Sequence, residues 1–179
     1  MVLEKMILNN VGAVVMVDDE ERVSGIITER DILRYMSEKL VTRCVDDIMT
    51  RDVVTASPNM TLREAAQAMI ELGFRRLPVL DDNGLVGIVV ATDLLRQFTI
   101  QNALKYSPRG SVYDVLRVPL HLFMIRDVYT TARDAEIGDV AKFMMSKNVG
   151  ALPVVEDGSL VGIITERDIL YDIVLAHYR

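Results

Sequence analysis

The sequence predicts a mixed α/β fold of the α+β type, in which tandem β-α-β-β-α repeats each form a small three-stranded sheet covered by two helices. One observation is that the nine residues GIITERDIL occupy positions 25–33 and return unchanged at positions 162–170. A second is that residues 49–95 and 124–170 align without a gap, and both begin with Met-x-Arg-Asp-Val. Self-similarity of this length indicates one supersecondary unit that recurs along the chain.

The first half of a repeat is clearest in residues 49–95. Residues 53–56 are a short β-rich run that Ser57-Pro58 ends, so they predict a strand followed by a turn. Thr61 is placed to cap a helix, because the apolar residues of 62–70 follow the i, i+3, i+4 spacing of one helical face. Gly73 then ends this helix as a C-cap glycine.

The second half of the repeat is a hairpin followed by a helix. Two apolar runs, residues 77–80 and 85–90, flank Asp-Asp-Asn-Gly, which is a strong signal for a tight β-turn. A second helix is expected to begin near Thr92. A unit of about 50 residues buries little apolar surface alone, so the repeats should pair.

The alignment divides the chain into three repeats. Residues 1–43 form a partial repeat that lacks its first strand, since it joins the alignment only at a point equivalent to Glu64. Residues 44–106 and 119–179 form complete repeats, and residues 107–118 form a linker. These are called repeats one, two and three below.

Composition limits the classes of protein to consider. Of 179 residues, 50% are hydrophobic and 6% aromatic, as in an ordinary soluble domain. The apolar runs are too short to span a membrane and no secretory leader opens the chain, so a soluble cytoplasmic protein is expected. The single Cys44 rules out an internal disulfide and agrees with a reducing compartment. A net charge of −6 argues against broad electrostatic capture of nucleic acid or anionic lipid, although a local basic patch could still hold an anion.

Four motifs give the sequence a family resemblance: the M-x-x-D-V opening, the LPVV strand, the acidic-Gly hairpin and the terminal G-h-h-T-x-x-D. On these residues, nearly the whole chain resembles the CBS domain, named for cystathionine β-synthase. The resemblance implies that repeats join into pseudo-symmetric pairs. It also implies that an adenine nucleotide, AMP, ADP or ATP, or a related adenosyl ligand, binds in clefts between repeats, with no further cofactor.

The T-x-x-D motif has a purely structural interpretation. Thr28 stands where a helix N-cap would lie, and Asp31 follows at the position of a capping-box acid. Thr165 and Asp168 repeat this arrangement. Capping alone could therefore account for both copies of the motif.

The resemblance adds a nucleotide-binding interpretation for the same Thr28, Asp31, Thr165 and Asp168. A helix N-terminus favours a phosphate, and a carboxylate one turn later can accept hydrogen bonds from a ribose diol. Repeat two keeps the acid as Asp93 but has a valine in place of the threonine. A site built on repeat two is therefore expected to be weaker or empty.

Five further residues are candidates for the nucleotide site. The resemblance places Arg75 and Arg76 near phosphate, and Lys147 at the corresponding joint of repeat three. The alternative is a solvated charge: the adjacent arginines slightly favour the functional interpretation, whereas for Lys147 the solvated charge is at least as strong. Thr55 and Thr130, at the ends of the first strands, match positions that contact the base.

Signals for catalysis or metal binding are weak. His121 and His177 have no second ligand at metal spacing, and both are expected to be surface or packing residues. Cys44 has no histidine to activate it and is expected to be buried or inert. No phosphate loop, nucleophile elbow or dinucleotide fingerprint occurs, so an enzyme is not expected.

The leading functional hypothesis is a regulatory module that senses adenine nucleotides and acts on a target protein. The alternatives are an interaction module without a small ligand and a nucleic-acid-associated CBS protein. The short join over residues 36–47 slightly favours pairing of repeats one and two, with repeats two and three as the other arrangement. Either arrangement leaves one repeat over, which predicts a homodimer.

Overall fold

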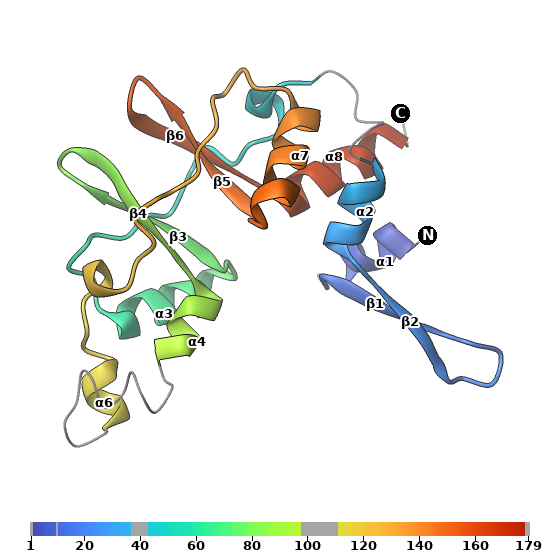
Figure 1. Ribbon diagram of the computed structural model, residues 1–179, viewed down its shortest axis with the longest axis horizontal. Coiled ribbons are helices and arrows are strands. Elements are labelled where there is room, and N and C mark those ends of the chain that lie inside the picture. Colours follow the sequence, from blue (N-terminus) through green and yellow to red (C-terminus); the bar gives the residue numbers. More distant parts are fainter. Residues whose placement is uncertain (1, 10, 37–42, 98–110, 178–179) are drawn as a thin grey trace. The chain divides into compact units, whose positions relative to one another are not determined.

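The computed structural model describes residues 2–9, 11–36, 43–97 and 111–177 (Figure 1). Contacts between residues divide the chain into two compact units. The first unit contains residues 1–51, 130–156 and 161–179, and the second contains residues 52–129 and 157–160. The units therefore do not follow the order of the repeats, and each is described by itself.

The second unit is built on the hairpin of repeat two. Strands β3 (Arg76–Asp81) and β4 (Gly84–Val90) pair antiparallel through the expected tight turn. Among the described residues of this unit, the helical elements are α3 (Leu62–Leu72), α4 (Ala91–Gln97), α6 (Val112–Val115) and the 3₁₀ turn η2 (Leu120–Leu122). Its core of buried side chains consists of Ala56, Leu62, Ala65, Met69, Leu77, Val79, Val89, Leu94, Val115, Leu120 and Met124.

Both predicted ends of helix α3 are confirmed. The Thr61 hydroxyl accepts a hydrogen bond from the Glu64 amide, and the Glu64 carboxylate accepts one from the Thr61 amide at 2.7 Å. Gly73 ends the helix with a left-handed φ of 74° and donates its N–H to the Met69 carbonyl. Glycine adopts this conformation without the Cβ clash that other residues meet.

The opening strand expected at residues 53–56 is reduced to one parallel bridge between Ala56 and Val79. The Ala56 amide donates to the Pro78 carbonyl, and the Leu80 amide donates to the Ala56 carbonyl, both at 2.9 Å. The next bond of a parallel ladder would need an N–H from Pro78, which proline lacks. The fold class of small antiparallel sheets with helices is confirmed, and the third strand contributes only this bridge.

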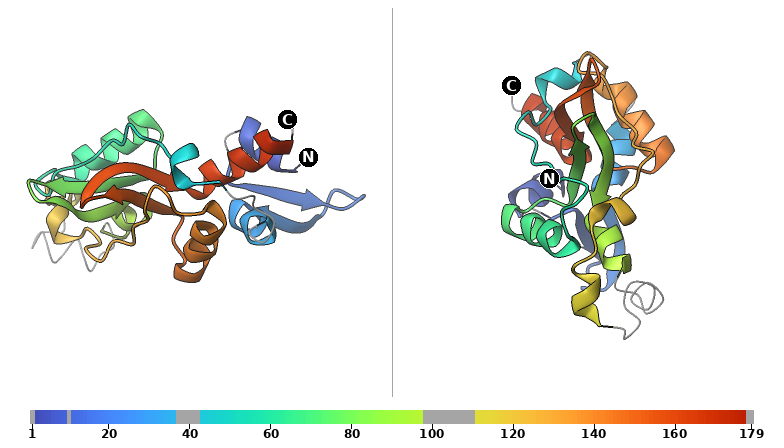
Figure 2. Two further views of the ribbon diagram at one scale, coloured as in Figure 1. Left: turned by 90° about the horizontal axis from the view of Figure 1, so that it is seen from above. Right: turned by 90° about the vertical axis from the view of Figure 1, so that its left-hand side faces the viewer.

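The first unit combines elements of repeats one and three (Figure 1). Repeat one supplies α1 (Val2–Leu8), β1 (Ala13–Val17), β2 (Val23–Thr28) and α2 (Glu29–Met36). Repeat three supplies α7 (Ile137–Lys147), β5 (Ala151–Glu156), β6 (Ser159–Thr165) and α8 (Glu166–His177). The β1–β2 hairpin extends beyond α1 and α2 as a two-stranded ribbon (Figures 1 and 2).

Repeats one and three pack through their helices. Helix α2 contacts both α7 and α8, and α1 also contacts α8. Leu33 of repeat one and Leu170 of repeat three are fully buried in the same cluster. The slight preference for pairing repeat one with repeat two was therefore wrong for this unit, which pairs repeat one with repeat three.

The Met-x-Arg-Asp-Val segment that opens each complete repeat lies against a strand of the other complete repeat. In the first unit, Thr50 from the start of repeat two forms two backbone hydrogen bonds of 2.9 Å with Ile163 of β6. In the second unit, Ile125 from the start of repeat three bonds in the same way to Ile88 of β4, at 2.9 and 3.0 Å. Each complete repeat thus gives its opening segment to the sheet of the other.

Candidate functional site

The T-x-x-D motif of repeat three joins strand β6 to helix α8. The Asp168 Oδ2 atom accepts hydrogen bonds from the Thr165 amide and hydroxyl, both at 2.8 Å. The Asp168 amide in turn donates to the Thr165 hydroxyl at 3.3 Å. The motif therefore forms a capping box, as the structural interpretation expects.

The T-x-x-D motif of repeat one has the same internal geometry. The Asp31 Oδ2 atom accepts from the Thr28 amide at 3.0 Å and from its hydroxyl at 2.6 Å. In both motifs the capping bonds converge on one carboxylate oxygen. Among the contacts of the described residues, Oδ1 of each aspartate accepts no hydrogen bond, so capping leaves it available to a ligand.

The two aspartates differ in their surroundings. Asp31 is exposed, and the hydrogen bond from the Thr28 hydroxyl lowers the pKa of its carboxyl. Asp168 is half-buried, and its burial raises the pKa of that carboxyl despite the bonds from Thr165. Loss of hydration disfavours the charged form, so a donor from a ligand would compensate Asp168 more than Asp31.

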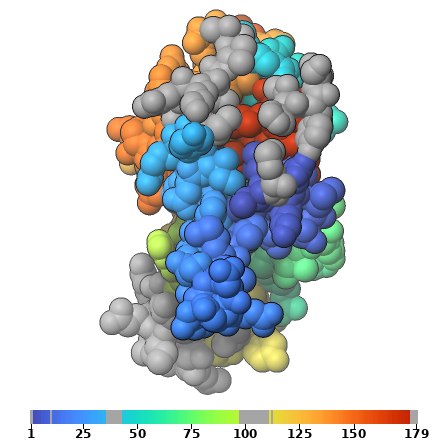
Figure 3. Space-filling model, turned by 90° about the vertical axis from the view of Figure 1, so that its right-hand side faces the viewer, coloured from blue at the N-terminus to red at the C-terminus, as the bar shows by residue number. Residues whose placement is uncertain are grey.

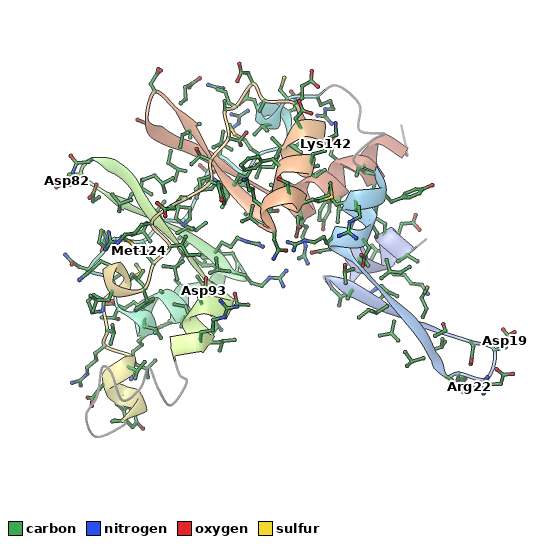
Figure 4. The ribbon with its side chains drawn as sticks, viewed as in Figure 1. Asp19, Arg22, Asp82, Asp93, Met124 and Lys142 are labelled. Carbon is green, nitrogen blue, oxygen red and sulfur yellow. The ribbon has the colours of Figure 1, made fainter. Side chains whose placement is uncertain are left out.

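In repeat two the candidate residues lie close together, although the capping threonine of the motif is absent. The Ala91 amide at the start of α4 donates to the Arg75 carbonyl at 2.9 Å, and Arg76 pairs with Val90 in the sheet. Asp93 lies at the start of α4 (Figure 4), where its carboxylate is 3.3 Å from the Arg96 guanidinium. The structure therefore brings Arg75, Arg76 and Asp93 to one end of the β3–β4 hairpin.

The two candidate threonines occupy equivalent positions in the units. Thr55 precedes the residue that bridges β3, and Thr130 precedes Thr131, which bridges β5 in the same parallel manner. Both threonines therefore lie toward the end of the sheet where the T-x-x-D helix begins. Thr130 is exposed, and Thr55 is half-buried.

Lys147 ends helix α7, and its ammonium group lies 6.0 Å from the centre of the Phe143 ring on the same helix. Asn148 follows it in the left-handed conformation, with a φ of 54°. The lysine side chain thus runs back along its own helix.

Sequence reasoning missed the role of the two residues between Thr and Asp. Glu29 accepts a hydrogen bond from Arg167 at 2.8 Å, and Glu166 accepts one from Arg30 at 2.8 Å. The glutamate of each repeat therefore pairs with the arginine of the other repeat. A signal was present in the sequence, because Ala91-Thr92 replaces Glu-Arg in repeat two, which is not part of this contact.

The arginine of the Met-x-Arg-Asp-Val opening also has a structural role. Arg51 donates to the carbonyl of Asp46 at 2.7 Å and to its carboxylate at 2.8 Å. Arg133 reaches the same carboxylate at 2.9 Å and also pairs with Glu156. The hydrogen bond from Arg51 lowers the pKa of the Asp46 carboxyl, with further support from Arg133. This network fixes the opening segment on repeat three.

Three further residues, two histidines and one cysteine, were candidates for catalysis or metal binding. The half-buried His121 has its Nδ1 atom 3.2 Å from the Pro58 carbonyl, which is a packing role. Cys44 is exposed, contrary to the alternative of a buried thiol. The side chain of His177 lies outside the described residues.

Neither a metal site nor a membrane-spanning helix is found among the described residues. They contain no group of three or more His, Cys, Asp or Glu side chains that could hold a metal ion. No helix in this part of the chain is long and apolar enough to cross a lipid bilayer.

The repeats and their T-x-x-D motifs define a protein of the tandem CBS class. The family model for the CBS domain matches residues 1–38, 45–99 and 112–175, and the chain belongs to this family. It is 36% identical over 170 residues to the protein MJ1225 of Methanocaldococcus jannaschii. The aligned region covers 94% of this chain and 61% of MJ1225. The chain thus spans about three fifths of that relative's length.

Solved structures extend this similarity to the fold. The crystal structure of MJ1225, a protein described as a proposed archaeal homologue of γ-AMPK, gives a TM-score of 0.88, and the match covers 96% of this chain and 62% of that chain. The CBS domain pair of MJ0100, in complex with 5′-methylthioadenosine and S-adenosyl-L-methionine, is 26% identical with a TM-score of 0.62, over 78% of this chain and all of that pair. CBSX2 in complex with AMP is 26% identical with a TM-score of 0.62, over 76% and 98% of the two chains.

Proposed function

We propose that this chain is a regulatory module that binds an adenine nucleotide at the T-x-x-D motif of repeat three. The supporting observation is the state of Asp168. One of its carboxylate oxygens caps helix α8, and the other accepts no bond among the described residues. Because the carboxyl is half-buried with a raised pKa, hydrogen bonds from a ribose diol would replace hydration that folding removes.

The rest of the site follows from the neighbouring elements. The N-terminus of α8, a helix of 12 residues, carries a partial positive charge that favours a phosphate. Thr130 lies toward the same end of the sheet and is exposed, so it can contact the base. Lys147 can contribute only if its side chain leaves Phe143.

Repeats one and two are weaker candidates for the same ligand. In repeat one, Asp31 keeps the motif but is exposed, so a bound diol would compete with bulk water. In repeat two, Arg75 and Arg76 can attract a phosphate and Asp93 can accept from a ribose diol, yet Val90 offers no hydroxyl to the ligand. We expect one principal site, at repeat three.

The relatives support an adenosyl ligand without identifying it. Two CBS structures that resemble this chain are described in complex with AMP, or with 5′-methylthioadenosine and S-adenosyl-L-methionine. We propose AMP, ADP or ATP, a role in regulating a target protein, and no catalytic activity. The homodimer expected from the odd number of repeats stays a prediction, which light scattering would check.

A thermal-shift and calorimetric screen tests the proposal. Purified chain is titrated with AMP, ADP, ATP, S-adenosylmethionine and NADH, and the Asp168→Ala variant is the test of the site. Asp31→Ala is the matched control, since it removes the same atoms from the exposed copy of the motif. A ligand at a hundredfold over its Kd stabilises the fold by about 2.7 kcal/mol.

Two outcomes would reject the proposal in different ways. If no adenosyl compound shifts the melting temperature at millimolar concentration, the chain is an interaction module whose T-x-x-D motifs serve only as caps. If a nucleotide binds but Asp168→Ala and Asp31→Ala weaken it equally, the principal site is not at repeat three.

A further inference from the structure

The residue three positions after the motif aspartate differs between the repeats. Residues 31–34 read DILR and residues 93–96 read DLLR, whereas residues 168–171 read DILY. Side chains three residues apart are neighbours on the surface of a helix, so this residue can interact with the aspartate. Repeats one and two therefore place an arginine beside the motif aspartate, and repeat three places a tyrosine there.

Repeat two shows what the arginine does. The Arg96 guanidinium donates to Oδ1 of Asp93 at 3.3 Å, at the start of α4 (Figure 4). In repeats one and three, the capping bonds converge on Oδ2 and leave Oδ1 without a partner among the described residues. A ribose diol at Asp93 would therefore have to displace the guanidinium or share the carboxylate with it.

In repeat one, Arg34 acts on Asp31 through its charge. The hydrogen bonds from Thr28 are the main cause of the lowered pKa of the Asp31 carboxyl, and the charge of Arg34 lowers that pKa further. The arginine thus already stabilises the Asp31 carboxylate when no ligand is bound. This reduces the stabilisation that a diol could add.

Tyr171 of repeat three brings no charge to Asp168. Within the described part of the chain, the Tyr171 hydroxyl forms no hydrogen bond with Asp168. Tyr171 instead borders a small cavity together with Leu3, Met6 and Ile7 of α1. Figure 3 shows part of α8, in red, at the surface next to α1, in dark blue.

Arg167, the only arginine or lysine of α8, is paired with another residue. Its guanidinium donates to Glu29 at 2.8 and 3.0 Å. Burial is the main influence on the pKa of the Asp168 carboxyl and raises it, while the charge of Arg167 lowers it only in part. Helix α8 therefore leaves the Asp168 carboxylate available to a ligand.

We propose that the residue three positions after the motif aspartate determines which repeat binds a ribose. Tyr171 leaves the Asp168 carboxylate to the diol, whereas Arg34 and Arg96 compete with the diol for Asp31 and Asp93. The inference rests on the proposed function and adds a selectivity residue to it. The ligand class is any adenosyl compound with an intact 2′,3′-diol.

The expected effects differ with burial. Ion pairs between exposed neighbours are weak, so Arg34 and Arg96 should each lower affinity for the diol only about two- to fivefold. An arginine beside the half-buried Asp168 should lower it about tenfold or more, because water screens that pair less.

Isothermal titration calorimetry of the full chain with AMP and with 2′,3′-dideoxy-AMP tests the proposal. The ratio of the two Kd values measures the share of the diol, and any attraction of a new arginine for the phosphate cancels in it. We expect a ratio of about ten or more for the native chain and of about one for Tyr171→Arg. Leu175→Arg is the matched control and should keep the native ratio, since it adds the same charge at an exposed position about two turns beyond Asp168.

Two further variants keep the test valid. Tyr171→Gln removes the ring without adding charge; if it also reduces the ratio to about one, the ring itself positions the ribose and the proposal is overturned. Arg34→Gln is the reverse test if Tyr171→Arg fails to fold. In an Asp168→Ala background it should raise the ratio about two- to fivefold, and an unchanged ratio would overturn the proposal.

Failure of this inference is distinguishable from failure of the proposed function. If the native chain does not bind AMP, both are overturned. If AMP binds and Tyr171→Arg keeps the native ratio, the inference alone is overturned.

Discussion

Glu29 and Arg167 belong to two identical nine-residue sequences that lie 137 positions apart, and their side chains form an ion pair at 2.8 Å. Arg30 and Glu166 form the reciprocal pair at 2.8 Å. The two copies of the repeated sequence are thus in contact, and the charged groups of each Glu-Arg dipeptide are paired with those of the other. Glu29 and Glu166 are only 15% and 11% exposed, so these bonds are poorly replaced by water.

Charge reversal tests the contact between repeats one and three. We expect Glu29→Arg alone to lower the free energy of unfolding by about 1–3 kcal/mol, because it sets two arginines together in a partly buried place. Arg167→Glu alone should cost a similar amount. The double variant should recover most of the loss, and a double-mutant cycle of denaturant unfolding measures the coupling. Additive losses would show that the two side chains do not interact.

The equivalent glycines of β6 and β2, Gly162 and Gly25, should not tolerate a side chain equally well. Gly162→Ala places a Cβ against the Met49 sulfur and the Thr50 carbonyl, and overpacking of this kind costs about 1–3 kcal/mol. Gly25→Ala meets only the flexible end of Met16 and should be nearly neutral. Thermal unfolding of the two variants compares them directly. Equal losses would contradict the described packing of Met49.

The two motif aspartates should respond to pH with opposite signs. Burial raises the pKa of Asp168, so this group stabilises the fold when protonated, and that contribution is lost as pH rises through its raised pKa. The Thr28 hydroxyl lowers the pKa of Asp31, so that group stabilises the fold above its ordinary pKa, and the contribution is lost as pH falls through the lowered value.

Asparagine substitutions separate these two cases at neutral pH. Asp168→Asn keeps an amide oxygen for the Thr165 donors and removes a poorly hydrated charge, so the melting temperature should stay the same or rise. Asp31→Asn removes a charge that its hydrogen bonds stabilise, so the melting temperature should fall. Thermal scans between about pH 4 and pH 7 check both signs. A larger loss for Asp168→Asn than for Asp31→Asn would contradict the difference in burial.

Repairing the motif of repeat two tests whether the threonine matters. Val90→Thr restores T-x-x-D at the start of α4, next to Asp93. We expect a capping bond worth about 0.5–2 kcal/mol and a second nucleotide site, which would show as increased stoichiometry in isothermal titration calorimetry. Val90→Ala is the control, since it removes apolar contacts without adding a hydroxyl. A gain in stability without a second site would show that the threonine serves the helix cap alone.

Local structure was predictable because its determinants lie close together in the sequence. Thr61 and Glu64 are three residues apart, and Gly73 follows the helix directly, so both ends of α3 could be read from sequence. Thr165 and Asp168 are equally close, which is why their capping box was predictable. The opening strand was overestimated for a non-local reason, because the missing N–H that shortens it belongs to Pro78 on another strand.

The sequence by itself determined the repeats, their hairpins and helices, and the T-x-x-D motifs, since each depends on bonds between residues near one another in the chain. Tertiary structure decided which repeats meet. Arg167 pairs with Glu29 across 138 positions, and Thr50 bonds to Ile163 across the length of two repeats. Such pairs depend on which apolar faces pack together: the buried Leu33 and Leu170 bring α2 against α8, and only then can the charged side chains reach each other. Tertiary structure also gave Asp31 and Asp168 different environments, because identical residues acquire different burial from the elements that surround them.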